Sequence, residues 1–238
     1  MVIICHGLTG HKDETHLVML ADSLQARGIA SIRFNFNGHG DDEANFTRHT
    51  ISKEVTEALA VYEYVSSLDW VDAGRIAVAG HSQGGVVAGL TAGELGADKV
   101  KCLGLMAPAA CIHTEVLSGD FVGKKYTDEQ IRELKSAADR DPAAPQGFDF
   151  WGGRCLGWDY VIDAAALDIH ALTARYKGPT AIIQGTKDDP GLIVDSKAYL
   201  NYMPGLEYFE LEGLTHCYPE DFPLAAHTTA AFLVEHLK

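Results

Sequence analysis

Two kinds of apolar pattern alternate along the chain. Short, continuous apolar runs are typical of strands buried on both faces, and they cover residues 2–5, 29–36, 75–79, 100–106, 180–184 and 207–211. Between them apolar residues recur at the spacing of amphipathic helices, in segments at residues 17–24, 51–65, 83–95, 196–203 and 223–237. Strands that alternate with helices predict an α/β fold with a mostly parallel sheet and helices on both faces.

Residues 108–177 break this rhythm. The stretch is too long to be a single connection in a compact domain. It contains a charged, helix-like piece at 128–140 and a Trp- and Gly-rich piece at 148–160. We therefore expect a core made of residues 1–107 and 178–238, with 108–177 inserted as a cap or lid. Such a cap would lie over the carboxyl ends of the strands, where open α/β sheets keep their ligand sites. An insertion without any role in substrate binding is the alternative.

Composition and charge narrow the class of protein. The chain has 238 residues, of which 47% are hydrophobic, and this is enough apolar material for one substantial core. The net charge is −14, from 19 Lys and Arg against 33 Asp and Glu. Such a surface repels phosphate backbones and anionic membranes, so we expect neither nucleic acid nor a membrane as a partner. No apolar run approaches the ~18 residues of a membrane-spanning helix, and no signal-peptide pattern is present.

The cysteines and histidines do not form recognisable ligand motifs. The five cysteines are odd in number, and no two have the CxxC spacing of a zinc or redox site. Free thiols in a reducing cytoplasm are therefore expected. His6, His11 and His16 do not share one helix face. We predict no metal and no organic cofactor, and a homodimer is left open.

Residues 80–84, Gly-His-Ser-Gln-Gly, form a G-x-S-x-G motif. A predicted strand precedes it and a helix of small residues follows, which is the context of a nucleophile elbow. In such an elbow a sharp, strained turn presents the hydroxyl of Ser82 above the sheet, and the flanking glycines avoid a steric clash. The alternative is an ordinary serine in a glycine-rich turn.

A serine nucleophile needs a general base, and the base needs a carboxylate that orients it. The elbow predicts the chain order Ser, then Asp or Glu, then His. Asp188 and Asp189 follow the strand at 180–184, and His216 follows the strand at 207–211. We expect His216 to be the base. The two adjacent aspartates both qualify as the acid, and the one that is not used would face solvent or cap the next helix.

Acyl transfer also requires hydrogen-bond donors for the oxyanion that develops on the substrate. The backbone N–H of the residue after the nucleophile, Gln83, supplies one. The loop after the first strand supplies the other, and we assign it to the backbone N–H of Leu8.

Six segments resemble those of a known superfamily. They are residues 6–12 (HGLTGHK), 33–40 (RFNFNGHG), 80–84 (GHSQG), 106–110 (MAPAA), 184–188 (QGTKD) and 212–216 (EGLTH). Together they resemble the α/β-hydrolases and, more narrowly, the small bacterial cinnamoyl/feruloyl esterases and related serine carboxylesterases. In that family the acid usually stands three residues after the glycine that ends its strand, which implies Asp188. The family usually has an antiparallel hairpin before the His-Gly strand, and we expect it to be missing here.

The resemblance implies hydrolysis of small-molecule carboxylic esters, with a hydroxycinnamoyl (feruloyl-type) acyl group under the cap. Aromatic residues in the inserted segment could stack on such an acyl group or simply pack the cap onto the sheet; they are Tyr126, Phe148, Phe150, Trp151, Trp158 and Tyr160. The alternatives are another serine hydrolase of this fold, such as a peptidase, thioesterase or lipase-like enzyme, and a non-catalytic binding protein.

Overall fold

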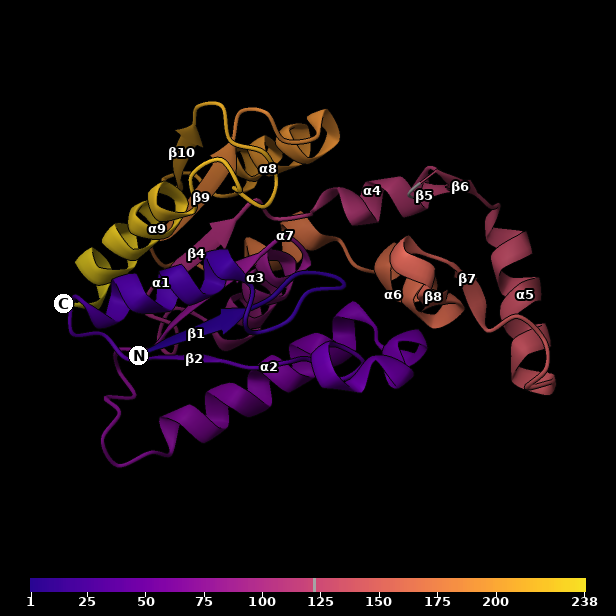
Figure 1. Cartoon of the computed structure of the whole chain (residues 1–238), viewed down its shortest axis with the longest axis horizontal. Helices are drawn as coiled ribbons and strands as arrows, with labels where there is room; N and C mark the ends of the chain where they lie inside the picture. The colour runs from indigo at the N-terminus through magenta and orange to yellow at the C-terminus, as the bar shows by residue number, and fades with distance from the viewer. Residues whose placement is uncertain (122) are drawn as a thin grey trace.

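A parallel sheet of six strands runs through the centre of the part of the chain described here, residues 1–121 and 123–238 of a computed structural model (Figure 1). The strand order is β10-β9-β4-β3-β1-β2, and every neighbouring pair is parallel. The strands are β1 (Val2–Cys5), β2 (Ser31–Arg33), β3 (Ala77–His81), β4 (Leu103–Met106), β9 (Thr180–Gly185) and β10 (Glu207–Leu211). The predicted α/β class is confirmed.

Helices cover both faces of this sheet, because its inner strands are apolar on both sides. In β1, Val2 and Ile4 pack towards α1 and α9, whereas Ile3 and Cys5 pack on the opposite side with α2 and α3. The helices of these two layers are α1 (Thr15–Gln25), α2 (Ile51–Ser66), α3 (Gln83–Leu95), α8 (Pro190–Tyr202) and α9 (Phe222–Leu237). No helix in the described residues is long and apolar enough to cross a membrane.

The strand predicted at 29–36 is shorter than expected, since β2 covers only Ser31–Arg33. It forms one edge of the sheet, pairs with β1, and its three residues are only partly buried. Beyond it the chain leaves the ladder, and the backbone N–H of Phe36 donates to His6 Nε2 at 3.1 Å. This contact brings the loop at 34–40 against the loop that follows β1.

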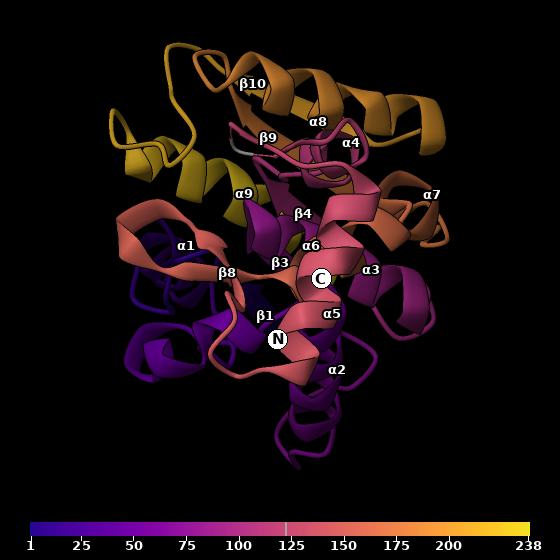
Figure 2. The same ribbon diagram turned by 90° about the vertical axis from the view of Figure 1, so that its right-hand side faces the viewer.

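Residues 108–177, here called the inserted segment, lie for the most part beyond the carboxyl ends of the strands (Figures 1 and 2). Their elements are α4 (Cys111–Leu117), β5 (Asp120–Phe121), β6 (Lys124–Lys125), α5 (Asp128–Arg140), β7 (Gly147–Asp149), η2 (Trp151–Gly153), β8 (Cys155–Gly157), α6 (Trp158–Ala166) and α7 (Ile169–Thr173). Helix α5 matches the predicted bounds, and Thr127 and Gln130 form a capping box at its start.

The last part of the inserted segment returns to the core layers. Helix α7 packs against α3, and the contact is very close. A Cβ atom on Gly93 would lie 2.3 Å from the carbonyl oxygen of Leu172, and one on Gly89 would lie 2.7 Å from Thr173 Oγ1. The glycines of α3 therefore allow the two backbones to approach.

This contact reverses the usual effect of replacing a helical glycine. Gly→Ala in a helix is ordinarily stabilising by about 1 kcal/mol. We expect Gly93→Ala instead to destabilise the fold by about 2 kcal/mol or more, because its methyl group must displace the backbone of Leu172. Thermal unfolding measures the change. Gly74→Ala is the control, since a Cβ there meets only Asp72 Oδ1 at 3.4 Å. A higher melting temperature for Gly93→Ala would contradict the packing described.

Candidate active site

Ser82 occupies the sharp turn between β3 and α3. Its backbone angles are φ 56° and ψ −123°, in a region that residues with side chains rarely adopt. The turn can be this tight only because Gly80 and Gly84 have no Cβ atoms. A Cβ on Gly80 would lie 2.0 Å from the carbonyl oxygen of Gly84, and a Cβ on Gly84 would lie 2.3 Å from that of His6. The strained turn therefore needs glycine at both positions, as expected for an elbow.

His216 lies on the loop after β10 and reaches the hydroxyl of Ser82. The distance from His216 Nε2 to Ser82 Oγ is 2.8 Å. On the other side of the ring, Nδ1 lies 2.9 Å from Asp188 Oδ2. The side chain of Asp188 is 1% exposed, whereas that of His216 is 30% exposed. The structure thus brings the three residues singled out in the sequence into one hydrogen-bonded line, with its inner end buried.

The Asp188 carboxylate accepts hydrogen bonds from three directions. Besides the His216 ring, Gln184 Nε2 donates to Oδ2 at 2.6 Å and the backbone N–H of Asp189 donates to Oδ1 at 2.7 Å. Because both oxygens act as acceptors, this arrangement suits the ionised carboxylate. Asp189 has a different role: its side chain caps α8 by accepting from the N–H of Gly191 at 2.8 Å. The sequence analysis includes Gln184 in the segment 184–188 but assigns it no role of its own.

A second histidine holds the His216 loop in place. His81 Nε2 donates to the carbonyl oxygen of His216 at 2.9 Å. Burial lowers the pKa of His81 well below its ordinary value, so the ring is neutral at physiological pH. Sequence reasoning missed this residue, because the variable position of a G-x-S-x-G motif carries no positional signal of its own.

The two expected oxyanion donors border the same cleft as Ser82. Leu8 and Gln83 both line it. In the described part of the chain the backbone N–H groups of Leu8 and Gln83 donate to no other protein group. The loop that carries Leu8 lies against the elbow, since a Cβ on Gly7 would lie 3.0 Å from Ser82 Cβ. Both N–H groups are therefore free to bind a ligand oxygen beside Ser82.

The side chain of Gln83 is tied into the protein interior. Its Nε2 donates to Glu54 Oε2 at 2.7 Å, and its Oε1 accepts from the hydroxyl of Tyr160 at 2.5 Å. Burial raises the pKa of Glu54 to about 8. Residue 83 is thus held by α2 on one side and by α6 of the inserted segment on the other. The sequence offers no signal for this network, because its members lie far apart along the chain.

The cleft above Ser82 has a volume of about 910 Å³. Its walls are mainly apolar and include Leu8, Ala109, Ile112, Phe150, Trp151 and Leu192. Of the six aromatic residues noted in the inserted segment, Phe150 and Trp151 line this cleft. Three others, Tyr126, Phe148 and Trp158, pack against one another with ring centroids 5.4–5.9 Å apart. Some aromatic side chains of this segment thus line the cleft, and others pack against one another.

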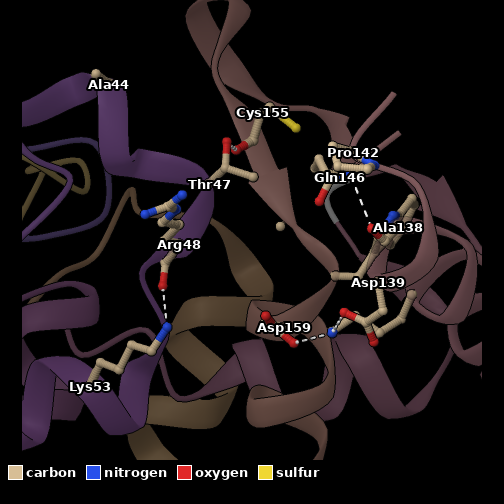
Figure 3. Close-up of a pocket in the computed structure, with 13 residues that line it drawn as sticks. Ala44, Thr47, Arg48, Lys53, Ala138, Asp139, Pro142, Gln146, Cys155 and Asp159 are labelled. Carbon is tan, nitrogen blue, oxygen red and sulfur yellow. Dashed lines mark hydrogen bonds and ion pairs between the residues drawn. The ribbon is translucent and has the colours of Figure 1, made fainter. Parts of the chain in front are cut away.

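A separate pocket of about 760 Å³ lies between the 3₁₀ segment η1 (Gly40–Arg48) and the inserted segment (Figure 3). Its lining mixes charged and apolar side chains. Lys53 donates to the carbonyl oxygen of Arg48, and Lys135 pairs with Asp139 and Asp159. None of Ser82, Asp188 and His216 lines this pocket, so it belongs to a different part of the surface.

Comparison with known structures gives close matches over almost the whole chain. Est1E from Butyrivibrio proteoclasticus, solved with ferulic acid bound, has a TM-score of 0.87 and 32% sequence identity; the match covers 99% of this chain and 88% of that one. A second Est1E structure matches with a TM-score of 0.84, 31% identity and coverage of 99% and 87%.

A more distant structure shares the fold. The monoacylglycerol lipase of Paleococcus ferrophilus has a TM-score of 0.73 at 17% identity, with coverage of 99% and 94%. A comparison with curated protein sequences finds no significant match. The model of the Hydrolase_4 family, described as serine aminopeptidase S33, matches residues 1–144. The expected resemblance is confirmed, and the chain belongs to this family of serine hydrolases with the α/β-hydrolase fold.

Proposed function

We propose that the protein is a serine carboxylesterase in which Ser82 is the nucleophile, His216 the general base and Asp188 the acid that orients it. The observation that carries the proposal is the hydrogen-bonded line from Ser82 through His216 to Asp188, at the base of an apolar cleft. A hydroxyl is a weak nucleophile at neutral pH, and this line supplies the base that it lacks.

In the proposed reaction His216 Nε2 takes the proton of Ser82 as its oxygen attacks the ester carbonyl. The negative charge that develops on the carbonyl oxygen is bound by the backbone N–H groups of Leu8 and Gln83. The imidazolium, stabilised by Asp188, gives its proton to the leaving alkoxide, and an acyl-enzyme remains. Water, deprotonated by the same histidine, then releases the carboxylic acid and restores Ser82.

We further propose that the acyl group is of the hydroxycinnamoyl type and that the inserted segment acts as its cap. Two observations support this. Phe150 and Trp151 line the cleft and offer flat apolar surfaces for a planar acyl chain. The similar protein Est1E has been solved with ferulic acid bound. The location that we propose is the cytoplasm, with which the five unpaired cysteines are compatible.

The substrate class is tested by steady-state hydrolysis of methyl ferulate beside p-nitrophenyl acetate and butyrate. We expect kcat/KM for the ferulate to exceed that for the short aliphatic esters by about tenfold or more, because only the aryl acyl group fills the aromatic-lined cleft. Ser82→Ala should lower kcat by about 10⁴-fold while the protein stays folded.

An alanine p-nitroanilide belongs in the same panel, because the matching family model is described as a serine aminopeptidase. Faster turnover of the anilide than of any ester would replace the esterase proposal by a peptidase. A preference for acetate would contradict the hydroxycinnamoyl assignment alone. Absence of all turnover by folded protein would favour a non-catalytic role.

The adjacent aspartates allow a matched comparison. Asp188→Asn should lower kcat by about 10³-fold or more, since an amide cannot stabilise the imidazolium and favours the wrong tautomer of His216. Asp189→Asn should change kcat by less than about threefold, because asparagine also caps helices well. Measured kcat values for the two purified variants decide the assignment. The reverse ranking would move the acid to Asp189.

A further inference from the structure

Three buried side chains that the proposed reaction does not use meet behind Gln83. His39 precedes η1, His49 follows it, and Glu54 lies in the first turn of α2. Their exposed fractions are 2%, 4% and 1%. One ring nitrogen from each histidine and one carboxylate oxygen of Glu54 all lie within 4.8 Å of one another. Two imidazoles and one carboxylate thus lie close together in the protein interior.

Backbone carbonyls determine which ring nitrogens carry protons. His39 Nδ1 lies 3.3 Å from the carbonyl oxygen of Asn37, and His49 Nδ1 is hydrogen-bonded to that of Phe46. A carbonyl oxygen only accepts, so each Nδ1 must be the donor. In the neutral ring the lone pair is then on Nε2. An N–H to backbone carbonyl bond is also how proteins usually orient histidines that bind metals.

Three polar atoms of the cluster make no hydrogen bond to the described part of the chain, although the carboxylate lies near one imidazole: Glu54 Oε1 is 3.9 Å from His39 Nδ1. Within the described residues, His39 Nε2, His49 Nε2 and Glu54 Oε1 are buried and make no hydrogen bond. Buried polar atoms in native proteins nearly always have a hydrogen-bond partner or a bound ligand. We therefore expect a bound species between these three side chains. A proton on Glu54 can satisfy only one of the two imidazole lone pairs. A cation attracts the lone pairs of all three groups at once.

We propose that His39, His49 and Glu54 bind a divalent transition-metal ion of the zinc class. Two imidazole nitrogens and one carboxylate oxygen match the ligands preferred by Zn²⁺ and Co²⁺ rather than the all-oxygen shells of Mg²⁺ or Ca²⁺. Metal–ligand bonds of ~2.0–2.2 Å require the three side chains to draw closer together on binding. The chain separations of ten and five residues match no ligand motif, which explains why the sequence analysis predicts no metal.

The position of the site suggests a structural role. An ion bound there would join both ends of η1 to the start of α2. The other carboxylate oxygen of Glu54 accepts from Gln83 Nε2, so the ion would also fix the first residue of α3. This inference does not depend on the proposed reaction, because its ligands are distinct from Ser82, Asp188 and His216.

The test uses the full-length protein, stripped with a chelator and desalted. Adding Zn²⁺ should give one tightly bound ion per chain by elemental analysis and raise the melting temperature by about 5 °C or more. Co²⁺ added instead should give the visible absorption of a low-symmetry site with nitrogen and oxygen ligands. If the protein shows neither a stoichiometric ion nor a thermal shift, the proposal is wrong and water is the occupant.

Variants separate this cluster from adventitious sites. Glu54→Gln keeps an acceptor for Gln83 and should fold, but we expect it to lose the tightly bound ion and the thermal shift. His49→Phe, a ring replacement among Phe46 and Tyr160, should do the same. Exposed His227 and the cleft residue His216 provide the controls: His227→Gln and His216→Ala should retain both effects. Loss of the ion in His216→Ala with retention in Glu54→Gln would place the metal in the cleft and contradict the proposal.

Discussion

The backbone of Ser82 is held in a conformation that residues with side chains avoid, and the surrounding structure is arranged to maintain it. The turn between β3 and α3 works only because Gly80 and Gly84 have no Cβ atoms to collide with neighbouring carbonyl oxygens. The backbone N–H of Ser82 donates to Met106 at the end of β4, at 2.9 Å. Strain of this kind persists only where neighbouring contacts over-determine it. Here the buried central strands of the sheet, β3 and β4, provide those contacts.

The same turn brings distant parts of the chain together. Gln83 begins α3, and its side chain is held by Glu54 from α2 and by Tyr160 from α6. His216 is held from two directions, by His81 at its backbone and by Asp188 at its ring. The Ser82 hydroxyl, the His216 ring and the N–H groups of Leu8 and Gln83 thus lie on the elbow and on two loops held against it. Such preorganisation is what electrostatic stabilisation of a transition state requires.

Much of this arrangement is predictable from the sequence because it obeys local rules. Buried strands, helical periodicity and the elbow motif each have a distinct pattern, and parallel strands place their carboxyl ends at one edge of the sheet. Ser82, His216 and Asp188 therefore meet where the chain order predicts. The contacts that the sequence does not predict join residues far apart along the chain. The Gln83 network is one example. The cluster of His39, His49 and Glu54 is closer in sequence, but its spacing matches no ligand motif.

The inserted segment shows most clearly which features cannot be predicted from the sequence. The pattern predicts α5, whose amphipathic face and capping box are local, but it does not show which aromatic residues line the cleft. Phe150 and Trp151 do so because β7 and β8 pair around them, whereas Tyr126, Phe148 and Trp158 pack against one another as part of the main core. The sequence pattern also does not show that α7 returns to pack on α3, because that contact depends on two glycines of α3.

The central claim is that Ser82 is a nucleophile activated by His216. The most direct test is mass spectrometry of the intact protein after brief treatment with a fluorophosphonate, which phosphonylates activated serines. We expect one adduct per chain, located by peptide mapping at Ser82 and absent from Ser82→Ala. His216→Ala should react far more slowly while remaining folded. An unmodified wild-type protein, or an adduct on another residue, would contradict the account.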